Sequence, residues 1–283
     1  MTLIIAGATG YVGARLYEKA SRTFEVIGTS SLRRSGLPHL DLQAPGDFDY
    51  GLIKAKDVIV VAAAISAPDV CASQYDYAYS VNVTGTSEFI ERIFERDGRI
   101  LFLSSDTVYG SSEEPVTETS PCHPAGEYGI MKHDLEKRFL GDTRFKALRL
   151  SYVFSREDKF SKYLENCAKS GARADIFHPF FRSAIYRDDV IAGICSLARD
   201  WDRFEYPVVN FGGPEMVSRK MIADSLQALA LPALRYDTTE PAEHFFRNRP
   251  RYINMRSDLL PTIIPNATHT IKQAIIADYG HEV

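Results

Sequence analysis

A glycine-rich turn near the start of the chain constrains its fold more than any other feature. Residues 3–6 form a short apolar run, residues 14–20 have the apolar spacing of a helix, and Gly7, Gly10 and Gly13 lie between them. Glycines at this point let the backbone approach a pyrophosphate while the amides of the following helix hold its negative charge. The sequence therefore predicts a strand, a dinucleotide-binding turn and a helix. A tight turn whose glycines serve only packing is the alternative.

The change from apolar run to helical spacing repeats along the first 150 residues. Further strands are predicted at residues 24–28, 57–63, 99–103 and 145–150, and helices at residues 84–96 and 128–140. This alternation is typical of a parallel sheet with helices on both faces. We therefore expect an α/β fold built on a doubly wound parallel sheet of the Rossmann type.

The order of elements is less regular beyond residue 150. Helices are predicted near residues 157–169 and 188–198 and a strand at 207–211, while residues 241–265 are rich in proline and arginine. We expect residues 1–150 to form the dinucleotide-binding domain, with residues 184–213 returning to it. Residues 151–183 and 214–283 are expected to form a smaller, irregular C-terminal lobe that binds the substrate.

Composition favours a small-molecule partner. The formal net charge of −4 and the pI near 6.0 give no electrostatic reason to expect nucleic acid or a membrane surface. The longest strongly apolar run, residues 58–65, is too short to cross a bilayer, and the N-terminus lacks a signal-peptide pattern, so a cytoplasmic protein is expected. The cysteines form no CxxC pair and the histidines lack zinc-ligand spacing, so no metal is expected.

The end of the second predicted strand bears on the choice of cofactor. Folds that prefer NAD usually place an acid there to bind the ribose hydroxyls, but residues 26–34 contain no acid and include Ser30, Arg33 and Arg34. Hydroxyl and guanidinium groups are suitable donors to a 2′-phosphate. NADP(H) is therefore preferred, NAD(H) is possible, and a solvated basic loop is the alternative.

Three residues form a candidate catalytic set. Tyr128 and Lys132 are four residues apart on a predicted helix, which places them on one face. We expect the lysine to lower the pKa of the phenol, so that Tyr128 exchanges a proton with a carbonyl or alcohol oxygen during hydride transfer. Ser105 follows the fourth strand, where such sheets bind ligands, and could hydrogen-bond the same oxygen. A Tyr-Lys pair alone is also common on ordinary helix surfaces.

Nearly the whole chain resembles the extended short-chain dehydrogenases, the NAD-dependent epimerase/dehydratase superfamily. Residues 7–13 resemble the opening fingerprint, 82–86 the start of the central helix, and 104–110 and 128–132 the catalytic blocks. Residues 186–190 and 210–215 resemble later segments. One set of cofactor-binding residues is expected. It combines the turn, the end of the second strand and the catalytic pair with the residues that the resemblance adds: Gly7, Thr9, Gly10, Tyr11, Val12, Gly13, Ser30, Arg33, Arg34, Asp41, Leu42, Ala62, Ala63, Ala64, Tyr128 and Lys132.

Within this superfamily the chain most resembles the dTDP-4-dehydrorhamnose reductase branch. The resemblance is carried by residues 62–69 and by an aspartate directly after the candidate catalytic serine. It implies NADPH as hydride donor, Tyr128 as proton donor, and a 4-keto, 6-deoxy sugar on a nucleoside diphosphate as substrate. The expected substrate residues are Ser66, Asp106, Thr107 and Arg182, and the tail arginines Arg247, Arg249 and Arg251 are further candidates for the diphosphate, with a solvated surface as their alternative.

The residue at position 107 narrows the set of possible reactions. Sugar-nucleotide dehydratases of the superfamily carry a glutamate at this position and the GDP-fucose synthase branch a cysteine, whereas this chain has Thr107. Thr107 also resembles the 4-epimerase motif, so a nucleotide-sugar 4-epimerase is the main alternative, and a non-catalytic NADP-binding regulatory subunit is a third. The chain departs from the superfamily pattern at Ser151-Tyr152 and at His133, and these departures weaken its assignment to one branch. The resemblance further implies a homodimer formed through the helices at residues 84–96 and 128–140.

Overall fold

The central sheet of the protein has six strands, all parallel, in the order β11-β6-β4-β3-β1-β2. The computed structural model describes residues 1–264, 266 and 268–280, so the end of the expected 214–283 lobe and positions 265 and 267 lie outside the described residues. The predicted doubly wound parallel sheet is confirmed, and each strand lies within two residues of its predicted place. The strands are β1 Thr2–Ala6, β2 Glu25–Thr29, β3 Val58–Val61, β4 Arg99–Ser105, β6 Phe145–Leu150 and β11 Val208–Phe211.

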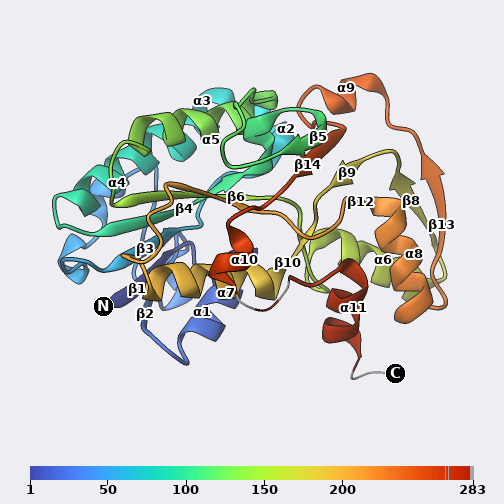
Figure 1. The fold of residues 1–283 in the computed structure, drawn as a ribbon, viewed down its shortest axis with the longest axis horizontal. Helices are drawn as coiled ribbons and strands as arrows, with labels where there is room; N and C mark the ends of the chain where they lie inside the picture. The colour runs from blue at the N-terminus through green and yellow to red at the C-terminus, as the bar shows by residue number, and fades with distance from the viewer. Residues whose placement is uncertain (265, 267, 281–283) are drawn as a thin grey trace.

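Alternate residues of the strands supply two cores, one on each face of the sheet. In β1, Leu3 and Ile5 face one core, and Ile4 and Ala6 face the other. Figure 1 shows the sheet between two helical layers, with α4 and α5 above it and α1 and α7 below it. The first core is covered by α1 Tyr11–Ala20, α7 Arg187–Arg199 and α10 Leu260–Ile263, and the second by α4 Thr86–Phe94 and α5 Gly126–Phe139.

The helix predicted at residues 84–96 begins earlier than expected. Helix α3 Tyr75–Tyr79 continues through a π-helical segment, Ser80–Gly85, directly into α4. A Cβ at Gly85 would lie 1.6 Å from the carbonyl oxygen of Leu42, so only glycine allows this close approach. The sequence pattern predicted this helix but neither the contact with Leu42 nor the continuity of the helix with the segment before it.

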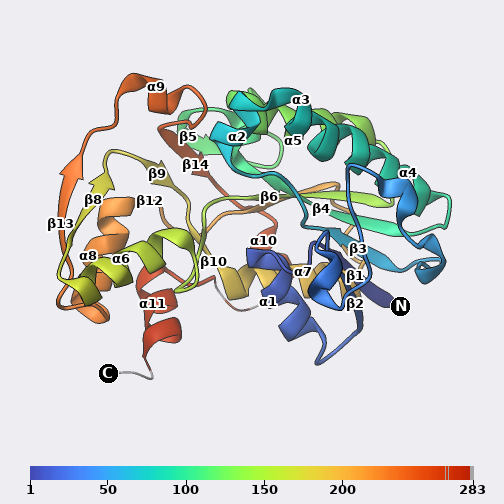
Figure 2. The same cartoon turned by 180° about the vertical axis from the view of Figure 1, so that it is seen from behind.

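The second part of the molecule is more regular than the sequence indicated. Its core lies among three helices and the strand β8, and Figures 1 and 2 show this group beyond the end of the large sheet. Strand β8 pairs in parallel with β13, and a four-stranded sheet in the order β12-β9-β14-β5 connects this group to the large sheet. The elements are β5 Ser112–Val116, α6 Lys159–Ser170, β8 Arg173–Phe177, β9 Phe181–Arg182, β12 Val217–Ser218, α8 Arg219–Leu229, β13 Arg235–Thr239, β14 Tyr252–Met255 and α11 Ile271–Tyr279.

Shorter elements complete the fold around the edge of the sheet where its parallel strands end. They are α2 Pro68–Ser73, which follows β3, the paired strands β7 Val153–Phe154 and β10 Ile185–Tyr186, and α9 Glu243–Phe246. Every helix in the described part of the chain is too short or too polar to span a membrane.

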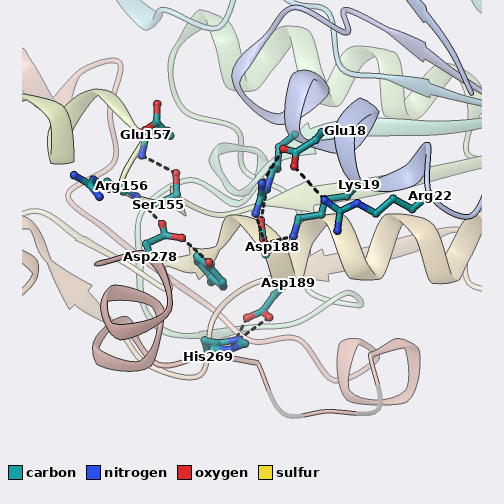
Figure 3. Close-up of polar contacts among 12 residues, drawn as sticks. Glu18, Lys19, Arg22, Ser155, Arg156, Glu157, Asp188, Asp189, His269 and Asp278 are labelled. Atoms are coloured by element: carbon teal, nitrogen blue, oxygen red, sulfur yellow. Dashed lines mark hydrogen bonds and ion pairs between the residues drawn. The ribbon is translucent and has the colours of Figure 1, made fainter. Parts of the chain in front are cut away.

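Polar contacts fasten α1 and the C-terminal segment to the start of α7. The guanidinium of Arg15 binds Asp188 with an N···O distance of 2.6 Å. The neighbouring Asp189 accepts a hydrogen bond of 2.7 Å from the backbone amide of His269 and lies 2.8 Å from its Nδ1 atom. Figure 3 shows Asp188 and Asp189 facing these two directions from one helix end. The helix that follows the glycine turn and the segment leading to α11 are therefore held by adjacent residues.

Candidate active site

The glycine turn brings the end of β1 against the end of β3. Gly7 has a φ of +93°, and a Cβ there would lie 2.9 Å from the backbone nitrogen of Ala63. A Cβ at Gly13 would lie 2.2 Å from the carbonyl oxygen of Gly7. No side chain caps α1 at Gly10. The first amides of α1 are thus left for an anion, and the residues present fit the pyrophosphate of a dinucleotide.

The expected phosphate-selecting residues lie just beyond β2. Arg33 and Arg34 are exposed in a short 3₁₀ turn, Arg33–Ser35. Ser30 is buried, and its Oγ atom accepts a hydrogen bond of 3.0 Å from the amide of Leu32 and lies 3.4 Å from Thr9 Oγ1. The two arginines therefore extend into solvent beside the turn, while the hydroxyl of Ser30 already has partners within the protein.

The other expected cofactor residues line the same edge of the sheet. Ala62 and Ala63 both donate their amides to the carbonyl of Ala6, with N···O distances of 3.0 and 2.8 Å. The Asp41 carboxylate accepts a hydrogen bond of 2.9 Å from the amide of Gln43, and the Leu42 side chain is buried. Ala63 also packs against Gly7 of the turn, and the Leu42 carbonyl packs against Gly85 of the π-helical segment.

The candidate catalytic residues gather where α5 meets the end of β4. Thr107 donates both its amide and its hydroxyl to Ser105 Oγ, at 3.2 and 3.0 Å. A Cβ at Gly129 would lie 2.9 Å from the carbonyl of Thr107, so the start of α5 packs directly on the turn after β4. Lys132 Nζ donates to the carbonyl of Leu103 at 2.7 Å and lies 5.6 Å from the centre of the Tyr128 ring.

The expected effect of Lys132 on Tyr128 is wrong in this structure. Burial raises the pKa of Tyr128 well above its usual range, and the nearby Cys71 and Asp106 raise it further. Burial also lowers the pKa of Lys132 to about 8. The ammonium group bonds the Leu103 carbonyl and not the phenol, so its charge does not offset the effect of burial on Tyr128. At neutral pH Tyr128 therefore holds its proton.

The expected substrate residues Asp106 and Arg182 face each other in the interior. Asp106 accepts a hydrogen bond of 2.9 Å from Ser151 and lies 3.6 Å from Arg182 Nε. Burial raises the pKa of Asp106 and lowers that of Arg182 to about 10. Ser66, by contrast, is exposed on the loop after β3. The structure therefore pairs two of these residues and leaves Ser66 at the surface.

One functional candidate was not singled out from the sequence. Arg219 is the first residue of α8, and its guanidinium lies 5.3 Å from the centre of the Phe180 ring, which Arg182 approaches to 4.4 Å from its own side. Burial lowers the pKa of Arg219, and the charge of Arg249 lowers it further. A cation in the first turn of a helix opposes the helix dipole, and this signal could have drawn attention to Arg219.

Asn82 is a second residue without a predicted role. It lies in the π-helical segment Ser80–Gly85, a kind of irregularity that is frequent at functional sites. Its side chain accepts from the amide of Ile65 at 2.8 Å and donates to the carbonyl of the same residue at 2.9 Å. Asn82 therefore fixes the loop that follows β3, next to Ser66.

A cluster of Cys122, His133 and Glu136 is the one group with metal-ligand chemistry among the described residues. Their ligand atoms lie within 4.8 Å of one another. Both carboxylate oxygens of Glu136 are already bonded by the guanidinium of Arg149, at distances down to 2.6 Å. A positive charge so close to the ligands opposes a metal cation, so this cluster does not fit a metal centre.

Sequence comparison decides the family. Residues 1–258 match the family described as RmlD substrate binding domain. The chain belongs to this family. This RmlD-family chain is 26% identical over 259 residues to methionine adenosyltransferase 2 subunit beta of Xenopus tropicalis, covering 84% of the chain and 75% of that protein. It is 26% identical over 227 residues to dTDP-4-dehydrorhamnose reductase of Aggregatibacter actinomycetemcomitans, covering 76% and 74% of the two proteins.

Structural comparison extends the similarity over the whole RmlD-family chain. A mutant UDP-glucuronic acid 4-epimerase from Bacillus cereus, in complex with UDP-4-deoxy-4-fluoro-glucuronic acid and NAD, superposes with a TM-score of 0.83. The sequences are 18% identical, and the match covers 99% of this chain and 98% of the other. The shared fold and the family match together confirm the predicted resemblance to the extended short-chain dehydrogenases and their reductase branch.

Proposed function

We propose that the protein is an NADPH-dependent reductase of a 4-keto, 6-deoxy sugar carried on a nucleoside diphosphate. The observation that carries this proposal is the position of Tyr128, which α5 holds beside the end of β4 where Ser105 lies. Membership of the RmlD family and similarity to a dTDP-4-dehydrorhamnose reductase support the same substrate class.

The roles of the three residues follow from their states. Tyr128 donates its proton to the oxygen of the keto group, and Ser105 hydrogen-bonds that oxygen as negative charge develops on it. Lys132, protonated below a pH of about 8, supplies a positive charge near the phenol that loses its proton. When bound, NADPH supplies the hydride to the keto carbon. Hydride and proton together convert C=O to CH–OH, so the reaction balances.

The proposed division of the chain follows its cores except at α10, which packs on the large sheet, and at Ala184 and Tyr186, which belong to the second core. Residues 1–150 with 184–213 would hold the dinucleotide, because β11 and α7 belong to the layers of the large sheet. Residues 151–183 and 214–283 would bind the sugar nucleotide. A homodimer through α4 and α5 stays a prediction.

Three arginines support an anionic substrate in the second part. The guanidinium groups of Arg182 and Arg219 lie near one phenyl ring, and each lies close enough to a neighbouring arginine to have its pKa lowered by it. Arg249 is the third, and it binds Asp69 of α2 at 2.5 Å. Like charges that repel one another are stabilised by a diphosphate between them.

The proposed function is tested by mixing the purified protein with NADPH and a panel of nucleoside-diphosphate 4-keto sugars. We expect one of these sugars to cause oxidation of NADPH in a one-to-one ratio with the reduced sugar formed, measured by absorbance and mass spectrometry. Oxidation of NADPH that is independent of the sugar, or absent with every sugar, contradicts the proposal.

Arg33→Ala tests the choice of cofactor. The substitution removes a charge-assisted hydrogen bond to the 2′-phosphate, of about 1.5–3 kcal/mol, so the Kd for NADPH is expected to rise at least tenfold while that for NADH changes little. Fluorescence titration measures both constants. Arg22→Ala, which removes another exposed arginine, is the control. An equal rise in the Kd values for NADPH and NADH would show that Arg33 does not bind the 2′-phosphate.

Arg219→Ala tests the proposed diphosphate contact. We expect the KM for the sugar nucleotide to rise about tenfold, the usual effect of losing one charge-assisted hydrogen bond, with the Kd for NADPH unchanged. Initial rates at varied sugar nucleotide give this constant. Lys220→Ala is the matched control, because Lys220 is the next residue and pairs with Asp224 on the same helix. An equal rise in both variants would argue against a specific contact.

Two alternatives have support of their own. The structural match to a UDP-glucuronic acid 4-epimerase favours a 4-epimerase, which interconverts two sugars with no net oxidation of cofactor. The similarity to methionine adenosyltransferase 2 subunit beta, a protein named as a subunit, supports the regulatory-subunit alternative, in which the chain would bind NADP(H) without turnover. The substrate panel separates the three functions, because only a reductase consumes NADPH with the sugar and only an epimerase changes the sugar without it.

A further inference from the structure

A buried carboxylate lies one helical turn beyond the candidate catalytic pair. Tyr128, Lys132 and Glu136 follow one another at intervals of four on α5, which places them on one face of the helix. Glu136 is completely buried, with an exposed fraction of 0%. A carboxylate in this position is costly unless it is paired, so its partners indicate what it does.

The partners of Glu136 connect α5 to the last residues of β4. Ser104 donates its hydroxyl to Glu136 Oε1 at 2.5 Å, and the preceding residue, Leu103, accepts from Lys132 at 2.7 Å. The next residue in the strand is Ser105. Leu103 and Ser104 of β4 therefore attach the strand to α5. Ser105, the residue after them, carries the hydroxyl that faces the proposed keto group.

A second set of contacts holds the carboxylate itself. Arg149 of β6 binds Glu136 through two guanidinium nitrogens, with the shortest distance at 2.6 Å, and donates to the Tyr109 hydroxyl at 2.8 Å. Tyr109 in turn donates to Asn210 of β11 at 2.7 Å. The position of Glu136 is therefore fixed by β4, β6 and β11 together, and it cannot shift without breaking charge-assisted hydrogen bonds.

We propose that Glu136 is a positioning residue of the candidate active site: its carboxylate fixes α5 against the end of β4 and supplies the negative charge that faces Lys132. The position of Tyr128 relative to Ser105 depends on this attachment, because Ser105 directly follows Ser104 in β4 and Tyr128 lies two turns before Glu136 on the same face of α5. The kinetic tests of this proposal rest on the proposed function, because they measure reduction of a sugar. The titration of Lys132 does not rest on it.

The electrostatic part of the proposal concerns the charge of Lys132. Burial lowers its pKa to about 8, while the charge of Glu136 acts in the opposite direction. Without the charge of Glu136, Lys132 would lose its proton at a lower pH. The groups that face Lys132 are Glu136 and Tyr128 on α5, Cys71 on α2, and the Phe102 ring and Leu103 carbonyl on β4.

The experiment compares Glu136→Gln and Ser104→Ala with Asp57→Asn. Asp57 is a buried carboxylate that accepts from the amides of Thr2 and Lys54 at the amino end of β3, whereas the candidate site lies at the carboxyl ends of the strands. Lysine labelled with ¹³C at Cε reports the titration of Lys132, whose signal is assigned by its loss in Lys132→Met. Initial rates across pH report kcat and KM.

Each variant has a distinct expected result. Glu136→Gln should lower the titration midpoint of Lys132 by about one pH unit, the effect of losing a neighbouring opposite charge, and should lower kcat at least tenfold with little change in the KM for NADPH. Ser104→Ala removes one contact without changing the charge, so kcat should fall about fivefold and the midpoint should stay. Asp57→Asn should change neither.

Two results would overturn the proposal. One is an unchanged Lys132 midpoint in Glu136→Gln, and the other is a kcat in Ser104→Ala equal to that of Asp57→Asn. If Glu136→Gln does not fold because Arg149 is left unpaired, Glu136→Asp keeps the charge and Ser104→Ala still tests the attachment. If the wild-type protein reduces no sugar, the proposed function fails, but the Lys132 titration still decides whether Glu136 acts on Lys132.

Discussion

Replacing Tyr128 with phenylalanine is expected to lower kcat at least a hundredfold and to leave the Kd for NADPH nearly unchanged. The reason is the proton. Burial raises the pKa of Tyr128, so the phenol is protonated throughout the neutral range and can act as a general acid, and loss of a general acid typically costs a factor of about 10²–10⁴. Single-turnover kinetics with NADPH and the sugar identified by the substrate panel measure this effect.

Tyr75→Phe is the matched control for this prediction. Tyr75 lies exposed on α3, so loss of its hydroxyl should leave turnover unchanged. Turnover in Tyr128→Phe equal to that of the control would remove Tyr128 from the mechanism. A loss of NADPH binding equal to the loss of kcat would instead indicate that Tyr128 binds the cofactor without donating a proton.

The second large effect is expected from Gly13→Ala in the glycine turn. Alanine is the better helix former by about 1 kcal/mol, so propensity alone predicts a small gain in stability. The new Cβ would, however, lie 2.2 Å from the carbonyl oxygen of Gly7, a contact that the turn can relieve only by moving. We expect the Kd for NADPH to rise at least tenfold, measured by fluorescence titration, together with a lower Tm.

Gly141→Ala separates the steric effect from the loss of a glycine. Gly141 follows α5, and a Cβ there would meet no atom within 4 Å, so this variant should bind NADPH as the wild type does. If Gly13→Ala bound NADPH normally, the turn would have room that the structure does not show, and its glycines would not be needed for the cofactor.

The sheet could be predicted from the sequence because its strands are buried on both faces. Such strands are nearly continuous apolar runs, as in residues 58–61, and helices with their own periodicity lie between successive strands of the sheet except between β2 and β3. The C-terminal lobe could be predicted less well. Strands β9 and β12 have two residues each, which is too short to give a periodic signal, and their place in a sheet depends on β14 from much later in the chain.

The candidate site, too, could be predicted from the sequence only in part. The spacing of Tyr128 and Lys132 on one helix face is a local property, and the structure has it. The partner of Lys132 is not local, because the carbonyl of Leu103 comes from β4. The sequence therefore predicted a lysine that lowers the pKa of the phenol, whereas burial and this carbonyl produce a phenol whose pKa is raised. Arg219 and Glu136 were missed for the same reason, since their partners are distant in sequence.

The sequence by itself determined the parallel sheet, the glycine turn and the order of the candidate residues along the chain. Each of these depends on backbone freedom at glycine or on the period of apolar residues, and both are properties of short segments. Only the tertiary structure decided which charges meet: Asp106 with Arg182, and Glu136 with Arg149. Protonation states depend on burial and on neighbours from other elements, so they exist only once α5, β4 and β6 are packed together.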